Sequence, residues 1–148
     1  MRRLLAGTAD AVWTVVPGDP SGAVYVAGST QDGATLHLWV AKLSPAGDEL
    51  WRTELDAIAG ASASDEAGGL AVSSAGLVYF ATQALLQDSQ SSMLYAADTD
   101  SGVSACGTVD TSWRWEDIAS LPSGAAVVVG WNHAGPDAIG IVRIMDVP

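Results

Sequence analysis

The stretch GAVYVAGSTQDGATLHLWVAKLSPAGDELWRTEL, residues 22–55, decides the fold of this 148-residue chain. Its apolar runs are separated by short groups of Gly, Ser, Pro and Asp, the residue types that form tight turns. In the last run, ELWRTEL, Trp51 and Leu55 lie on the face opposite Arg52. This two-residue period is typical of a half-buried antiparallel strand. The stretch therefore predicts three short strands joined by turns.

Two weaker copies of this stretch follow it in the chain. They align with the first copy on a turn glycine followed by an apolar run of residues that favour strands. A further apolar element, at residues 68–72 and 115–121, precedes the second and third copies, and residues 11–16 are its counterpart before the first. The aligned stretches are DPSGAVYVAG (19–28), SSAGLVYFAT (73–82) and LPSGAAVVVG (121–130), with Gly22, Gly76 and Gly124 in register.

Four strands in a unit of about fifty residues are the pattern of a β-propeller blade. The sequence therefore predicts an all-β fold, a propeller-like array of four-stranded antiparallel blades. The whole chain, 1–148, is interpreted as one partial propeller. Its expected parts are the outer strands of a cut blade (1–16), one blade (17–72), a second blade (73–121) and the inner strands of another cut blade (122–148).

The first copy resembles the SBBP-type bacterial β-propeller repeat. That family reads approximately D-x-x-G-N-V-Y-V-A-G-x-T and then V-A-K-L-D-x-x-G-x-x-x-W, and residues 19–55 follow it except at Ala23 and Ser44. In the second copy, Thr82 replaces Gly28 and Asp98 replaces Leu43 in this alignment. The resemblance implies an array of blades from secreted or surface bacterial proteins, and therefore an extracellular or cell-surface location. It implies no catalytic residues.

A ring of blades normally needs about four to eight of them, so three blades cannot close a ring alone. Each open face is expected to expose about five large apolar side chains, on the order of 10 kcal/mol of unburied apolar surface. The expected partner is therefore either the remaining blades of the ring or a second copy of this chain. These two alternatives stay open.

The formal net charge is −11, which disfavours nucleic acid and anionic lipid as partners. No apolar run reaches the length of a membrane helix. Asp10 interrupts the apolar segment that follows Arg2 and Arg3, so no signal peptide is expected at residues 1–18. Cys106 is the single cysteine, so no intramolecular disulfide is expected.

Tryptophan residues are the best candidates for ligand recognition. Trp113 and Trp115 have the same parity in TSWRW, and Trp131 follows an expected inner strand near the axial end of the propeller. Exposed rings at such an end could stack on a sugar, so a glycan or a protein is the expected ligand class. Tryptophan packed between blades is the alternative interpretation of the same residues.

Candidates for metal binding or catalysis are weaker. His37 and His133 are the two histidines, and neither belongs to a metal-binding motif. Asp98 and Asp100 alternate as in a calcium loop, but the later residues of such a loop are missing, so a hairpin turn is expected instead. No catalytic, metal or cofactor residue is predicted.

The leading hypothesis for function is a non-enzymatic propeller module that serves as an extracellular scaffold or binding domain. One alternative is a fragment of a propeller enzyme whose active site lies in a central channel outside these residues. A second alternative is a structural spacer without a ligand. Whether the chain is an enzyme stays uncertain, and a non-enzymatic role is favoured.

Overall fold

The computed structural model describes residues 10–18, 20–59, 61–63, 68–86, 89–110, 113–132 and 139–145. Across these ranges the chain forms strands and turns without a helix, so the predicted all-β class is confirmed. Within them, no helix could cross a membrane. The strands are β1 (Asp10–Pro17), β2 (Val24–Asp32), β3 (Thr35–Leu43), β4 (Glu49–Ala59), β5 (Ala61–Ala63), β6 (Leu70–Val72), β7 (Leu77–Leu86), β8 (Ser89–Asp98), β9 (Ser104–Asp110), β10 (Trp113–Ser120), β11 (Ala126–Asn132) and β12 (Ile139–Met145).

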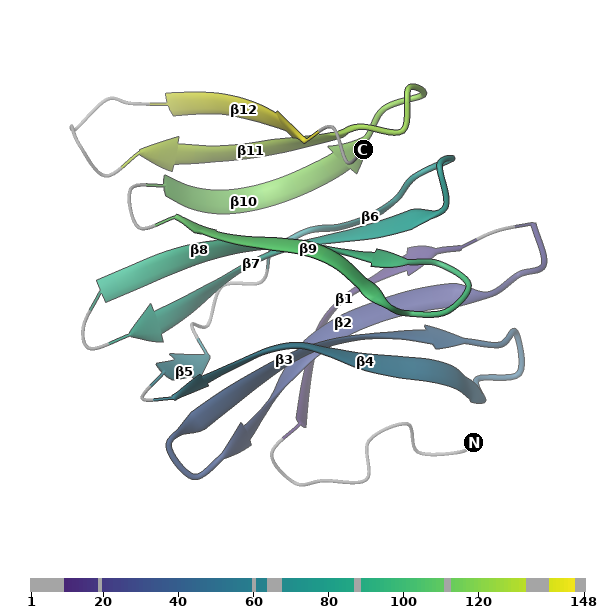
Figure 1. Cartoon of the computed structure of the whole chain (residues 1–148), viewed down its shortest axis with the longest axis horizontal. Helices are drawn as coiled ribbons and strands as arrows, with labels where there is room; N and C mark the ends of the chain where they lie inside the picture. The colour runs from purple at the N-terminus through teal and green to yellow at the C-terminus, as the bar shows by residue number, and fades with distance from the viewer. Residues whose placement is uncertain are drawn as a thin grey trace.

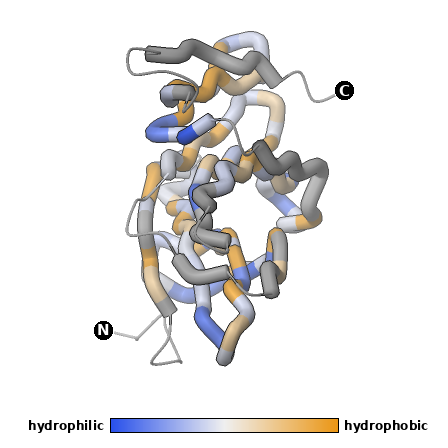
Figure 2. The backbone as a smooth tube through the Cα atoms, turned by 90° about the vertical axis from the view of Figure 1, so that its left-hand side faces the viewer, coloured by the Kyte–Doolittle hydropathy of each residue, from blue (hydrophilic) through white to orange (hydrophobic). Residues whose placement is uncertain are grey.

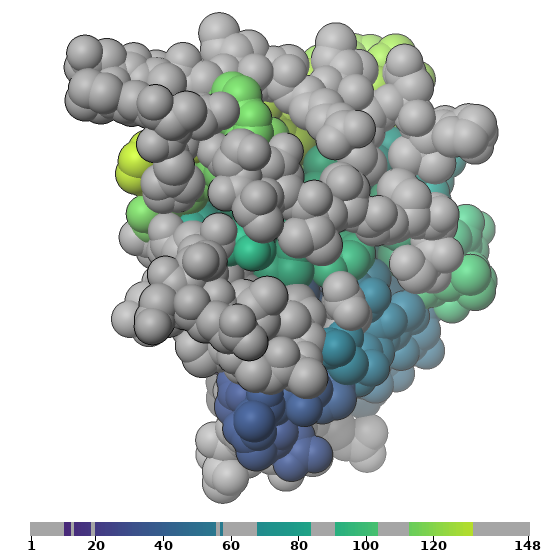
Figure 3. Space-filling model, turned by 60° about the vertical axis from the view of Figure 1, so that its left-hand side comes forward, coloured from purple at the N-terminus to yellow at the C-terminus, as the bar shows by residue number. Residues whose placement is uncertain are grey.

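The described strands form three antiparallel sheets, each made of strands that follow one another in the chain. Sheet A has the order β1-β2-β3-β4, sheet B has the order β5-β7-β8-β9 with β6 also paired to β7, and sheet C has the order β10-β11-β12. The sheets lie one above another, with sheet B in the middle (Figure 1). The described surface accordingly runs in chain order from blue at one end, through teal, to yellow-green at the other (Figure 3).

The boundaries of the sheets differ from the predicted division of the chain. That division placed residues 11–16, 68–72 and 115–121 at the end of the preceding unit. In the structure, β1 pairs with β2, β6 pairs with β7 and β10 pairs with β11, so each of these strands belongs to the unit that follows it. A short turn joins each pair, and strands joined by a short turn form an antiparallel hairpin. Residues 1–9, the first part of the outer strands expected at 1–16, lie outside the described residues.

The turn glycines that align the three copies share one backbone conformation. Gly22, Gly76 and Gly124 have φ angles of 83°, 81° and 92°. Glycine adopts this left-handed region without the steric cost that a Cβ atom brings. The alignment of the copies on these glycines therefore corresponds to one turn geometry repeated in each sheet.

Two hydrophobic layers hold the three sheets together, and hydrophobic segments recur in all of them (Figure 2). Between sheets A and B, the buried side chains include Tyr25, Leu38, Val40, Phe80 and Tyr95. Between sheets B and C, the buried side chains include Tyr79, Leu94, Trp115, Ile118 and Val128. Sheet B is thus covered on both faces, which makes it the centre of the described core.

A glycine lies where two strands approach closely in each sheet. A Cβ atom on Gly28 would overlap the carbonyl oxygen of Ala11, and one on Gly130 would overlap that of Arg114. Both glycines therefore relieve crowding between neighbouring strands. In sheet B, Thr82 occupies the position of Gly28. The close approach is made possible by Gly68 in the neighbouring segment instead, because a Cβ atom on Gly68 would overlap the carbonyl oxygen of Ala81.

The outer face of sheet A carries apolar side chains, of which some are buried and some are exposed. Val26, Trp39, Ala41 and Leu43 form an apolar cluster on this face, and each is at most 7% exposed. On the same face, Val15 pairs with Val26 and is 60% exposed, and Val12 pairs with Gly28 and is 42% exposed. The outer face of sheet A is therefore partly open, as is the outer face of sheet C, where Val129 is 43% exposed.

Candidate functional site

The structure separates the three tryptophans proposed for ligand stacking. Trp113 and Trp115 lie on β10 with ring centroids 5.5 Å apart and an angle of 10° between the planes. Both rings pack against the core between sheets B and C, and Trp115 is only 4% exposed. This pair therefore serves the packing of two sheets, which is the alternative that the sequence left open.

Trp131 lies on the opposite face of sheet C. It pairs across the strands with Arg114, and directly paired residues share a face while neighbouring residues alternate. Its indole N–H donates to Oε1 of Glu116 over 2.8 Å, and the guanidinium carbon of Arg114 lies 5.1 Å from its ring centroid. Trp131 is 39% exposed, so part of its ring remains accessible. It is the most exposed of the three candidates, because Trp113 is partly buried and Trp115 is buried.

The turn that begins at Asp98 is a hairpin turn, as the sequence predicted. Oδ1 of Asp98 accepts hydrogen bonds from the amides of Asp100 (3.0 Å) and Ser101 (2.7 Å) and from the Ser101 hydroxyl (2.7 Å). The Ser101 amide, then the Ser101 hydroxyl, lower the pKa of the Asp98 carboxyl. Among the described residues, no group of three His, Cys, Asp or Glu side chains could hold a metal ion.

The strand register corrects the alignment of Asp98 with Leu43. In sheet A, Val24 pairs with Leu43. The equivalent of Val24 in sheet B is Val78, which pairs with Ala97, so Ala97 is the true counterpart of Leu43. Asp98 therefore takes the place of Ser44. Ser44 has the matching role in its own turn, because its hydroxyl oxygen accepts the amide of Ala46 over 3.2 Å.

The turn in sheet B is consequently one residue longer than the turn in sheet A. The left-handed glycine comes three positions after Ser44, at Gly47, but four positions after Asp98, at Gly102. Aligning the two turn glycines hid this extra residue and moved the strand by one position. The difference between the two spacings was nevertheless visible in the sequence.

The longer turn places Thr99 between sheets A and B. Its amide and its hydroxyl both donate to the carbonyl of Gly76, at 2.9 and 3.0 Å. Its own carbonyl accepts from the Tyr25 hydroxyl (3.2 Å), the Lys42 ammonium (3.2 Å) and the Trp51 indole (3.3 Å). Thr99 is therefore a hydrogen-bonded bridge between sheet A and the β6–β7 turn of sheet B.

The equivalent contact between sheets B and C has no such bridge. Tyr79, the counterpart of Tyr25, donates directly to the carbonyl of Gly124, the counterpart of Gly76, over 2.8 Å. The Ser73 hydroxyl donates to the same carbonyl over 2.9 Å. A Cβ atom on Gly124 would lie 2.8 Å from the Cβ atom of Ala75, so the two turns are in close contact.

A cavity of about 510 Å³ lies beside Thr99. Most of its lining comes from the β1–β2, β6–β7 and β8–β9 turns, which lie at the same end of the molecule (Figure 1). We name it the turn cavity. It lies where Thr99 enters between sheets A and B. Its lining residues are Pro17, Gly18, Pro20, Tyr25, Val72, Ser73, Ser74, Gly76, Thr99 and Asp100.

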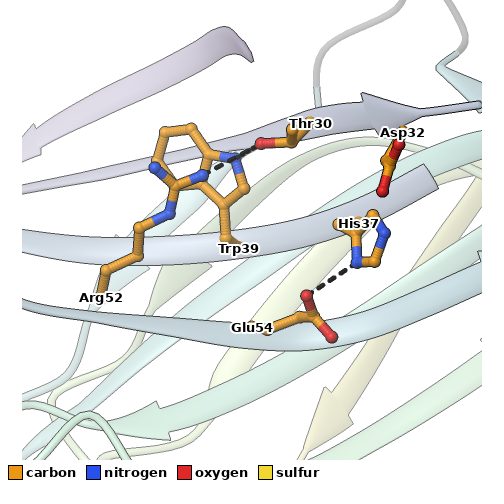
Figure 4. A pocket seen from close by; sticks show the side chains of 6 residues that line it. All are labelled: Thr30, Asp32, His37, Trp39, Arg52 and Glu54. Carbon is orange, nitrogen blue, oxygen red and sulfur yellow. Dashed lines mark hydrogen bonds and ion pairs between the residues drawn. The ribbon is translucent and has the colours of Figure 1, made fainter. Parts of the chain in front are cut away.

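A second, smaller hollow of about 230 Å³ lies on the outer face of sheet A (Figure 4). Nδ1 of His37 lies 2.7 Å from Oε2 of Glu54, and the guanidinium carbon of Arg52 lies 4.0 Å from the Trp39 ring centroid. Thr30 and Asp32 complete its lining. We name it the sheet A pocket.

Sequence reasoning missed the sheet A pocket as a group, although the strand parity contained the signal. The lining residues occupy alternate positions on β2, β3 and β4 and therefore share one face. The side chain of His37, one of the two histidines, is 28% exposed in this pocket. His133 lies outside the described residues.

No protein-family model matches the chain, and no curated protein is similar to it. Its function is therefore inferred from the geometry of the sheets, the turn cavity and the exposed side chains.

Proposed function

We propose that the chain is a non-enzymatic β-propeller repeat module of the SBBP type, which serves as an extracellular or surface scaffold with a binding face. The observation that carries this proposal is the repetition of one sheet-to-sheet contact along the chain. The buried residues Tyr25 and Tyr79 hold equivalent positions, and each donates to a turn carbonyl of the next sheet. In a propeller, each blade packs on the next through the same faces.

The corrected register adds support to the resemblance. The SBBP pattern has Asp directly after V-A-K-L, where the first copy has Ser44. Asp98 now takes this position in the second copy, and its carboxylate accepts the amides of the turn. An aspartate that organises the turn is a physical reason for Asp in the pattern.

The proposed partners are the remaining blades of a ring or a second copy of the chain, and a glycan or a protein is the proposed ligand. The outer face of sheet C suits the first role, because Val129 is 43% exposed on a sheet face that no other described sheet covers. The outer face of sheet A suits the same role, because Val15 is 60% exposed there beside the buried cluster.

Light scattering of the purified chain tests the partner part of the proposal. We expect a mass above that of one chain, and we expect Val129→Asp to reduce it, because the substitution puts a charge on the open face of sheet C. Val103→Asp, at a residue that is 64% exposed beside the β8–β9 turn and away from both open sheet faces, is the matched control. A parent protein that stays monomeric at high concentration would contradict this part.

A glycan and peptide array tests the binding part. We expect a ligand that the parent retains and that Trp131→Ala loses, because Trp131 is the most exposed of the three candidate tryptophans. An array without any bound ligand would favour the structural spacer.

An enzymatic role is the second candidate, and the sheet A pocket favours it. There Glu54 holds the imidazole of His37 through Nδ1, the arrangement that orients a histidine as a general base. Hydrolysis of a panel of ester and glycoside substrates, lost in His37→Ala, would support this candidate. Unchanged hydrolysis in that variant would remove it.

A further inference from the structure

The turn cavity is the feature that breaks the repetition of the sheets. Between sheets B and C, where Tyr79 bonds directly to Gly124, the turns touch. There the Ser74 hydroxyl donates to the carbonyl of Pro122 over 3.4 Å. Where Thr99 enters, between sheets A and B, the turns leave a space of about 510 Å³. Pockets that bind small organic ligands have volumes of about 300–1,000 Å³. The extra residue of the turn thus coincides with a space of ligand size.

The hydroxyl groups around the turn cavity have donated their protons elsewhere. Those of Tyr25, Ser73, Ser74 and Thr99 donate to the carbonyls of Thr99, Gly124, Pro122 and Gly76, respectively. A hydroxyl group that donates its single proton presents only lone pairs to other neighbours. The Ser74 and Thr99 hydroxyl oxygens can therefore accept hydrogen bonds from a ligand but cannot donate to it. Tyr25 and Ser73 are at most 5% exposed, and the Ser73 oxygen already accepts the amide of Ala75.

Backbone donors near the cavity are committed in the same way. The amides of Gly18 and Gly76 donate to the carbonyls of Ala23 and Ser73, at 2.8 and 3.2 Å. The amide of Asp100 donates to the Asp98 carboxylate over 3.0 Å. Pro17 and Pro20 have no N–H group. The lining is consequently rich in acceptors, and the carboxylate of the exposed residue Asp100 is one of them.

The charges near the turn cavity also favour a ligand with donors. Asp100 is exposed, and the chain as a whole carries −11. The nearest described cation is Lys42, which is 9% exposed and bonded to the Thr99 carbonyl. Besides the Ser101 hydrogen bonds, Lys42 contributes to the lowered pKa of the Asp98 carboxyl, and Asp100 is the acidic residue among the described residues that line the cavity. A negative field of this kind attracts cations.

We propose that the turn cavity binds an organic cation with N–H donors, a primary ammonium or a guanidinium group on an aliphatic stem. The cationic head would donate to the Asp100 carboxylate and to the hydroxyl oxygens of Ser74 and Thr99, and the stem would lie along Pro17 and Pro20. This inference deepens the proposed binding role and rests on it. The same chemistry occurs in a free polyamine and in a basic side chain of a peptide.

Isothermal titration of the whole chain tests the proposal with two probes, spermidine and a trilysine peptide. We expect at least one probe to bind with a one-to-one stoichiometry, and the tighter probe identifies the source of the cation. Acetylated trilysine should not bind, because acetylation removes the side-chain charges. If neither probe binds at millimolar concentration, or if the acetylated peptide binds equally well, the proposal is overturned.

Two matched variants separate the cavity from the general negative field. We expect Asp100→Asn to weaken binding about tenfold, the effect of losing one charge-assisted hydrogen bond. Asp48→Asn, in the equivalent turn of sheet A and outside the cavity lining, should leave the affinity within about twofold. Equal weakening by both substitutions would mean that the cation senses only the net charge, and the proposal would be wrong.

A third variant tests whether the longer turn creates the site. Deleting Thr99 restores the shorter turn, and we expect it to abolish binding while the far-ultraviolet circular dichroism stays that of a β protein. Binding that survives in this folded variant would overturn the role of Thr99. These titrations do not depend on the oligomer mass or the glycan array, so they can fail while the scaffold proposal stands, and the reverse.

Discussion

The hydroxyl group of Tyr79 donates a hydrogen bond to the carbonyl oxygen of Gly124, 2.8 Å away in the next sheet. The bond is buried, and it closes the contact between sheets B and C at the end where the turns meet. Its counterpart between sheets A and B runs from Tyr25 to Thr99 over 3.2 Å. The same residue type therefore joins each sheet to the next, but with different acceptors.

This difference predicts unequal effects of removing the two hydroxyl groups. We expect Tyr79→Phe to lower the free energy of unfolding by about 1 kcal/mol, the usual contribution of a buried hydrogen bond. Tyr25→Phe should cost less, because the Thr99 carbonyl keeps Lys42 and Trp51 as donors. Urea unfolding of both variants measures the difference. A larger loss for Tyr25→Phe would contradict the stronger contact assigned to sheets B and C.

Close strand approach at Gly28 gives a second prediction. Gly28→Ala would push a Cβ atom into the carbonyl of Ala11, so strands β1 and β2 would have to move apart. We expect a loss of about 3 kcal/mol in the free energy of unfolding, the upper range for overpacking. Gly33→Ala is the control: its Cβ atom would meet nothing within 4 Å, and its φ of 57° alone should cost about 1 kcal/mol. Thermal unfolding that ranks the two variants the other way would be evidence against the crowding.

Turn chemistry was the part of the fold that could be predicted from the sequence. Gly22, Gly76 and Gly124 were aligned from neighbouring residues alone, and all three have the left-handed conformation. The need for glycine at such a position is local, so a short segment reveals it. A short segment does not reveal to which sheet residues 11–16 belong, because this assignment depends on which other strand completes their hydrogen bonds. That part of the division therefore differed in the structure.

The candidate sites were harder to predict for the same reason. The parity of Trp113 and Trp115 indicated correctly that they share a face, but parity does not say whether that face is buried. The turn cavity depends on Thr99 reaching Gly76, a contact between residues 23 positions apart. Comparing the spacings Ser44–Gly47 and Asp98–Gly102 would have located the inserted residue. It would not have revealed the space beside it.

The Asp98 carboxylate predicts a dependence of stability on pH. Hydrogen bonds from Ser101 lower the pKa of this group in the folded protein. A lowered folded-state pKa contributes stability above the unfolded-state pKa, and this contribution is lost as the pH falls through the folded-state value. We therefore expect Asp98→Asn to be less stable than the parent at pH 7, with the difference shrinking in acid below the ordinary aspartate pKa.

Chemical unfolding at several pH values from neutral to strongly acidic measures this difference. Asp48→Asn is the control, since the turn of sheet A is organised by the Ser44 hydroxyl instead of a carboxylate. Its stability relative to the parent should change less with pH. A difference between parent and Asp98→Asn that stays constant down to strong acid would show that the carboxylate charge does not stabilise the turn.

The tryptophans of sheet C give the prediction that separates packing from recognition. Trp115 is 4% exposed and stacks on Trp113, so Trp115→Ala should cost about 3–5 kcal/mol in the free energy of unfolding. Trp131 is 39% exposed, and its main contacts are with Arg114 and Glu116 on the same face. We expect Trp131→Ala to cost about 1 kcal/mol or less, because little apolar surface loses its cover. Urea unfolding measures both, and Trp131→Phe preserves a ring without the indole N–H. If Trp131→Ala proves as destabilising as Trp115→Ala, Trp131 is a packing residue, and a loss of array binding in that variant would then carry no information on recognition.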